Sequence, residues 1–99
     1  MVLTTTNSIE GFKISEYMGI VTGVSMFDGK ITMGFSMSKY HKAIQDSIDE
    51  VKEKAFQSLT ENAKKLGANA VVGIKVDIEL TTSNYTLVSV TGTAVQVAT

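Results

Sequence analysis

Three charged side chains could form a polar site on one strand. Lys75, Asp77 and Glu79 alternate with apolar residues, so they project from the same face of an extended segment. A lysine flanked by two carboxylates can hold a ligand or, where it is buried, take part in acid–base chemistry. An exposed set of this kind is an ordinary cross-strand charge cluster or forms salt bridges between subunits. The three residues are therefore candidate ligand-binding residues, and no catalytic residue is assigned.

A second candidate site would bind a soft metal ion. His41, the single histidine, follows Met33 and Met37 at steps of four residues. Thioethers and imidazole suit ions such as Cu(I), but methionines also fill irregular gaps in apolar cores, which is the interpretation that we favour. Cysteine is absent, and one histidine leaves no histidine-based zinc site within a chain. The composition indicates no cofactor and no metal beyond these soft-metal candidates.

The sequence contains no motif for hard-metal binding, nucleophilic catalysis or phosphate binding. Four acidic residues recur at helical steps, with lysines nearby that can neutralise them, which is typical of a solvated face. They are Asp46, Asp49, Glu50 and Glu53. The nucleophile motif Gly-x-Ser-x-Gly is absent, and no glycine-rich loop continues into a phosphate-binding lysine. Nine basic against ten acidic residues give a net charge of -1, which argues against a nucleic-acid partner.

The length of 99 residues is that of one domain, spanning 1–99. No apolar run approaches the ~18 residues of a membrane span, so we expect no membrane partner. The first residues carry neither a basic nor a long apolar segment, and we expect a cytoplasmic protein.

The middle of the chain predicts one long helix from about Lys39 to Leu66. Its apolar stripe runs at steps of three and four residues and comprises Tyr40, Ile44, Ile48, Val51, Ala55, Leu59, Ala63 and Leu66. Gly67 is the expected C-terminal cap. Asn62 interrupts the stripe, and its amide could bond to a strand carbonyl, reach a neighbouring subunit or stay partly exposed.

Two strands are predicted after the helix. Val72, Ile74, Val76, Ile78 and Leu80 alternate with Gly73 and charged residues, which predicts one apolar and one polar face. A turn cluster at Thr81 to Asn84 separates this strand from a second one, Tyr85 to Val97, and the pair forms an antiparallel hairpin.

Extended segments are also predicted ahead of the helix. Lys13 to Phe27 is a strand in which Gly19 and Gly23 allow a close approach or mark a bulge. Asp28-Gly29 is a hairpin turn, followed by a strand from Lys30 to Ser36. Residues 1–6 form a short edge strand.

This order predicts an α+β fold with two layers, one mixed or antiparallel sheet and one helix, plus a short extra hairpin. The final strand fills the gap between the two strands that the helix connects. The sheet face away from the helix carries Leu87, Val95 and Val97 among Ser89, Thr91 and Thr93. Such a half-apolar face is typically completed by another subunit.

Four segments carry a family resemblance: Thr4-Thr5-Thr6, Gly19 to Gly23, Leu66 to Gly73, and Gly92 to Val97. In these the chain resembles the YbjQ-like family, small bacterial and archaeal proteins that carry a heavy-metal-binding label. Residues 28–38 depart from the family pattern. The resemblance implies a dodecin-subunit-like fold and a homo-oligomer, a pentameric ring, and no established activity.

Three functional hypotheses remain open. The first is a non-enzymatic binding or scaffold module, with sites for a small ligand at subunit boundaries. The second is an enzyme with an inter-subunit site around Lys75, Asp77 and Glu79. The third is a purely structural assembly with no ligand. A metal-binding protein is a further alternative, which the donor count disfavours. What separates these hypotheses is whether a concave pocket exists beside Lys75 and Asp77, and whether it is wet and polar or filled.

Overall fold

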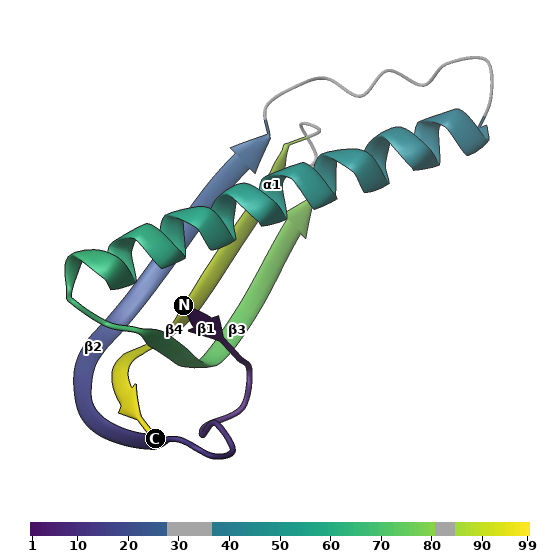
Figure 1. The fold of residues 1–99 in the computed structure, drawn as a ribbon. Coiled ribbons are helices and arrows are strands. Elements are labelled where there is room, and N and C mark those ends of the chain that lie inside the picture. The colour runs from purple at the N-terminus through teal and green to yellow at the C-terminus, as the bar shows by residue number, and fades with distance from the viewer. Residues whose placement is uncertain (28–36, 81–84) are drawn as a thin grey trace.

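The computed structural model describes residues 1–27, 37–80 and 85–99 and has one long helix over one sheet (Figure 1). Its elements, in chain order, are β1 (Val2–Leu3), β2 (Lys13–Phe27), α1 (Met37–Lys65), β3 (Ala70–Leu80) and β4 (Thr86–Ala98). The predicted α+β class is confirmed, and each described element lies within two or three residues of its predicted position. No helix in the described ranges is long and apolar enough to cross a membrane.

The sheet has the strand order β1-β3-β4-β2. β4 is antiparallel to both β2 and β3, while β1 is parallel to β3. The final strand therefore fills the gap between the two strands that α1 connects, as predicted. The predicted strand from Lys30 to Ser36, its Asp28-Gly29 turn and the turn at 81–84 lie outside the described residues.

α1 ends in a Schellman motif. Gly67 has a φ of 83°, in the left-handed region that favours glycine. Its backbone N–H donates to the carbonyl oxygen of Lys64 (2.9 Å), and that of Ala68 donates to Ala63 (3.1 Å). Two of the last helical carbonyls are thereby satisfied, and Ala68 is turned into the core. The predicted glycine cap is confirmed.

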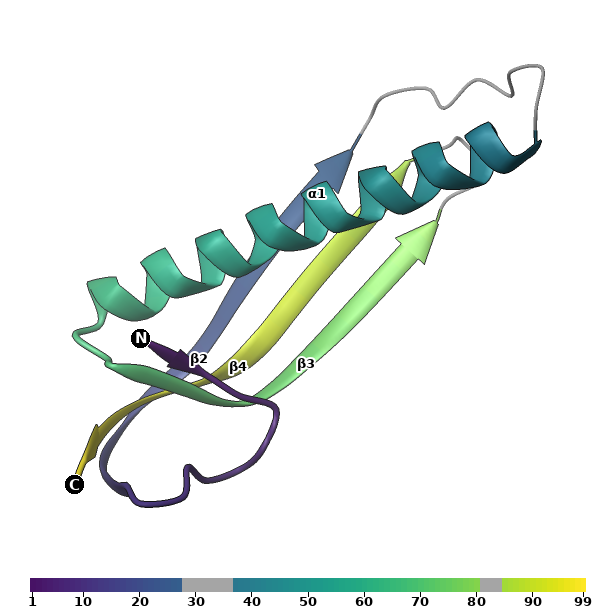
Figure 2. The ribbon, with the colours of Figure 1, turned by 45° about the vertical axis from the view of Figure 1, so that its right-hand side comes forward.

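The main core lies between α1 and the sheet, the two layers that Figure 2 shows. α1 contributes Val51, Ala55, Leu59 and Ala63, and the strands contribute Val21, Val71, Ile74, Val88, Val90 and Ala94. The predicted stripe is correct over its middle. It is wrong at its end, where Leu66 is 45% exposed because the chain turns away at the cap.

Gly23 sets the distance between helix and sheet. A Cβ atom at this position would lie 2.0 Å from the carbonyl oxygen of Ala55 and 2.6 Å from the backbone nitrogen of Leu59. Only a residue without a side chain allows so close an approach. Gly23 thus takes the first predicted role, a close approach. Gly19 takes the second: it lies at a bulge, where its φ is 111° and the β2–β4 register shifts.

A bulge in β3 overturns one sequence prediction. Val72 pairs with Thr93, but Lys75 pairs with Thr91, so β3 holds one residue more than β4 at this point. Gly73 absorbs the extra residue with a φ of 62°. The side-chain alternation reverses there, so Val72 and Ile74 belong to cores on opposite faces of the sheet. The single apolar face predicted from Val72 to Leu80 is therefore wrong at its first residue.

The sheet face away from α1, here called the open face, is partly covered by the chain itself. Val95 and Val97 were expected to be exposed there, yet both are buried with Ala70 and Val72. Ile9 and Ile14 from the N-terminal region pack against this second core. Residues before and at the start of β2 thus seal one end of the open face.

We expect Gly23→Ala to destabilise the fold strongly. The new methyl group would meet helix backbone, which cannot rotate away, so α1 must shift from the sheet at a cost of at least about 2 kcal/mol. Urea unfolding at fixed protein concentration measures the effect. Lys52→Ala, at an exposed position of α1, is the control and should change stability by less than about 0.5 kcal/mol. Equal stability of the two variants would disprove the close contact.

Val51→Asp should prevent folding into stable protein. Val51 is 2% exposed, so a carboxylate there would be an unpaired buried charge that costs about 4 kcal/mol or more. The corresponding change at Ile48, which is only half-buried, should be milder than its place in the stripe suggests. Glu53→Ala, on the exposed face of α1, is the control and should leave the circular dichroism spectrum and the thermal unfolding midpoint unchanged. If Glu53→Ala destabilised the protein as much as Val51→Asp, the orientation assigned to the helix would be wrong.

Candidate functional site

The predicted charged row lies on the open face, near the outer edge of the sheet. Lys75, Asp77 and Glu79 pair with Thr91, Ser89 and Leu87 of β4. Directly paired residues of antiparallel strands share a face, so all six side chains project away from α1. The three charged residues are exposed, and among the described residues no ion pair joins them. They share a face as predicted, but they do not form a buried catalytic group.

An apolar row lies on the same open face along β2. Ile20 and Val24 pair with Thr93 and Ser89 of β4, and Tyr17 and Met26 extend the row. All four side chains are more than half exposed, with Ile20 at 78% and Tyr17 at 71%. The open face therefore changes from apolar over β2, through hydroxyls on β4, to charged over β3. Two bulges in β2 shift the alternation, which is why the sequence pattern did not reveal this row.

A second exposed apolar row lies on the helix-facing side of β3. Val76, Ile78 and Leu80 pair with Val90, Val88 and Thr86, which face α1. Figures 1 and 2 show that α1 runs over β2 and β4 rather than over the outer half of β3. Val76, Ile78 and Leu80 consequently stay exposed although they point toward the helix layer.

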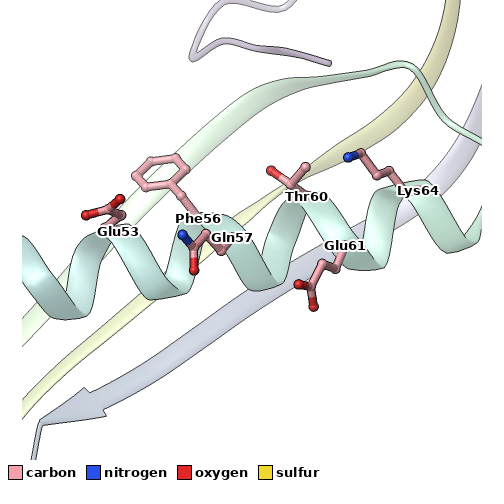
Figure 3. A pocket seen from close by; sticks show the side chains of 6 residues that line it. All are labelled: Glu53, Phe56, Gln57, Thr60, Glu61 and Lys64. Atoms are coloured by element: carbon pink, nitrogen blue, oxygen red, sulfur yellow. The ribbon is translucent and has the colours of Figure 1, made fainter.

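Two open hollows are present among the described residues. One, of about 560 Å³, is lined entirely by α1 and is shown in Figure 3; its residues are Glu53, Phe56, Gln57, Thr60, Glu61 and Lys64. The other, of about 650 Å³, is formed by the N-terminal segment; its residues are Val2, Leu3, Thr4, Thr6, Ser8, Ile9 and Glu10. Neither of these two hollows is lined by Lys75, Asp77 or Glu79.

The soft-metal candidates lie only partly within the described residues. Met37 is the first residue of α1, and His41 lies one turn later with an exposed side chain. Met33 lies outside the described residues. Within the described ranges, no group of three or more His, Asp or Glu side chains is arranged to hold a metal ion.

The acidic face of α1 is solvated, as its pattern predicts. Glu50 and Lys54 form an exposed ion pair across one helical turn, with 3.2 Å between Nζ and Oε1. Exposed pairs of this type stabilise a helix only slightly.

Two asparagines hold the fold together through backbone contacts. The Asn69 side-chain amide donates to the Val97 carbonyl oxygen (2.9 Å), and its oxygen accepts from the Val97 N–H (2.8 Å). Asn62 Nδ2 donates to the carbonyl oxygen of Thr22 in β2 (2.8 Å), the first of its predicted alternatives. Asn69 was missed in the sequence, where the only signal for it was its place between the helix cap and a strand.

Comparisons with known proteins agree on one family. A family profile described as "Putative heavy-metal-binding", YbjQ_1, matches residues 1–98. A UPF0145 protein of Carboxydothermus hydrogenoformans is 33% identical, over 98% of this chain and 96% of the relative. A UPF0145 protein of Geobacillus kaustophilus is 34% identical, over 97% of both chains.

A solved structure has the same fold. It is a crystal structure of a protein with unknown function, of the DUF74 family, from Pediococcus pentosaceus. The TM-score is 0.71 with 22% sequence identity, and the match covers 99% of this chain and 98% of the other. At this identity the likeness concerns the fold alone.

The donor set of the chain does not fit a zinc site, and a titration can test this. With no cysteine and one histidine in the sequence, a single chain offers too few nitrogen and sulfur ligands. We expect calorimetry to find no zinc binding tighter than about 1 µM, or about -8 kcal/mol. Silver is the soft-ion comparison. A stoichiometric sub-micromolar zinc site that is lost in His41→Ala would overturn this prediction, whereas a silver site lost only in Met33→Leu would support the methionine candidates.

Proposed function

Because this chain belongs to the YbjQ family, which carries the description "Putative heavy-metal-binding", we propose that it is a homo-oligomeric, non-enzymatic binding module. Its ligand sites lie at subunit boundaries formed by the open face of the sheet. The proposed ring of five subunits rests on the family resemblance.

The shape of a single chain is the observation that carries this proposal. Its radius of gyration is 16.4 Å and its extents are 54 × 22 × 16 Å, whereas a compact domain of this length has a radius of gyration of about 13 Å. Its accessible surface is 6597 Å², compared with about 5,500 Å² for a typical monomer of its mass. The chain thus exposes more surface than a monomer of its size usually does, which favours burial against further copies.

The open face supplies the surface for such burial. Ile20 and Val24 lie on either side of Thr22 along β2, and Met26, next along the same face, pairs with Leu87 on β4. Exposed apolar rows of this extent are typical of protein–protein contacts. At about 25 cal/mol per Å² of apolar area, burying them offers a substantial driving force for assembly.

The charged side chains of β3 would bind a ligand at the proposed contact between subunits. Lys75, Asp77 and Glu79 lie on the same face, two strands from the apolar row. A second copy that covers the apolar row would bring its own surface near these charges and form a concave site beside them. The alternative of an inter-subunit enzyme has less support, because Lys75, Asp77 and Glu79 are exposed and, among the described residues, form no ion pair with one another.

The metal described for the family is not adopted for this chain. Sulfur and nitrogen donors are too few in the sequence, and the described residues contain no cluster of possible ligands. Any metal would have to be held by several copies together.

Light scattering at micromolar concentration should give a molar mass several times the 10.6 kDa of one chain.

Ile20→Asp should shift the protein toward monomers, because a carboxylate in the apolar row would be desolvated on assembly. Native mass spectrometry of protein from its own host would give the subunit number and any retained ligand in one measurement.

Gln45→Glu is the matched control, because it adds the same charge at an exposed position of α1. It should leave the assembly intact. A monomeric wild-type protein, or equal dissociation of both variants, would reject the open face as the subunit contact.

A further inference from the structure

The hollow formed by the N-terminal segment is lined by both apolar and oxygen-bearing side chains. Val2, Leu3 and Ile9 give it apolar side chains, while Thr4, Thr6 and Glu10 give it oxygen atoms. No part of the proposed subunit contact uses this hollow. Its residues include the threonines of the segment that marks the family resemblance.

The hydroxyl hydrogen bonds determine which groups remain for a ligand. Thr6 Oγ1 donates its single proton to the carbonyl oxygen of Ser8 (2.6 Å). The 2.7 Å contact between the two threonine hydroxyls must therefore use the proton of Thr4. Thr4 Oγ1 also accepts from the backbone N–H of Thr6 (3.1 Å). Both protons are engaged within the segment, so the two oxygens can offer a ligand only lone pairs.

These oxygens are held in place by β3. The carbonyl oxygen of Thr4 accepts from Ile74 N–H (3.1 Å), and that of Thr6 accepts from Gly73 N–H (2.8 Å). The Thr4 N–H donates to Val71 (3.0 Å). The backbone of the segment is thus fixed at the β3 bulge, and its acceptors are preorganised, which lowers the entropic cost of binding.

We propose that this hollow binds a primary alkylammonium group. An ammonium has three donors and no acceptor, which complements the two threonine oxygens and the Glu10 carboxylate. Its alkyl chain lies along Val2, Leu3 and Ile9. A divalent metal ion fits less well, since calcium takes six to eight oxygen ligands and gains nothing from an apolar wall. Free amines and lysine side chains share this chemistry.

The experiment uses the full chain with labelled threonine methyl groups, which remain observable in a large assembly. Titration with n-butylammonium chloride should shift the Thr4 and Thr6 methyl resonances in a saturable way. n-Butanol has the same apolar chain but donates one proton and carries no charge, so it should bind at least about tenfold more weakly. Equal shifts with butanol would mean that the hollow recognises only the alkyl chain, and the proposal would be wrong.

Glu10→Gln is the decisive variant, because it keeps the side-chain size and removes the charge at an exposed position. Butylammonium binding should fall about tenfold or more, by loss of a charge-assisted hydrogen bond. Glu16→Gln, an exposed carboxylate on β2, is the matched control and should bind as the wild type does. Equal affinity of the two variants would overturn the proposal. Thr4→Val should also weaken binding while Thr4→Ser retains it.

Two further arms identify the source of the ammonium group. N-acetyl-lysine methylamide binding at least as well as butylammonium would support a lysine side chain, and weaker binding would support a free amine. Potassium chloride that produces the same shifts at equal concentration would show a general cation site and overturn the proposal. The oligomeric state is measured separately, so failure of this site and failure of the proposed assembly are distinguishable.

Discussion

The close contact between α1 and β2 at Gly23 is the constraint on which the fold depends. Because no Cβ intervenes, the backbone of Ala55 and Leu59 lies directly on the strand. Ala55, Leu59 and Ala63 are fully buried along this contact, and Asn62 ties the helix to the carbonyl oxygen of Thr22. A helix held this firmly over β2 and β4 cannot also cover β3, since it is a single cylinder about 10 Å wide.

The uncovered surfaces follow from that placement. The outer half of β3 exposes Val76, Ile78 and Leu80 on the helix side, and β2 exposes Ile20 and Val24 on the open face. In the ranges that the structure describes, a single helix lies over a sheet with two faces (Figure 2). The N-terminal segment seals a part of the open face through Ile9 and Ile14, at one end of the sheet. The remaining apolar area is the surface that the proposed assembly would bury.

The segments that carry the family resemblance meet largely at that same end. Thr4 and Thr6 bond to the β3 bulge at Gly73 and Ile74, and Asn69 bonds to Val97. Gly92 leaves room for Val71 and Ile74 to close over β4, since a Cβ there would lie 2.6 Å from Val71 Cγ1. Most of these residues therefore have a structural role in joining β1, β3 and β4. The threonine hydroxyls combine that role with a hollow in which they can act as acceptors.

Local patterns in the chain were enough to predict the α+β class, the helix with its glycine cap, the approximate bounds of the described strands and the common face of Lys75, Asp77 and Glu79. These depend on local periodicity and on capping residues, which act over a few positions. Only the tertiary structure decided that Val72 and Ile74 face opposite sides, that Asn69 pairs with Val97 and that Thr4 lies against Ile74. A bulge adds one residue and reverses every later side chain, and no alternation pattern marks where it falls. The other two contacts join residues far apart in the chain, and their geometry exists only once helix and sheet are packed.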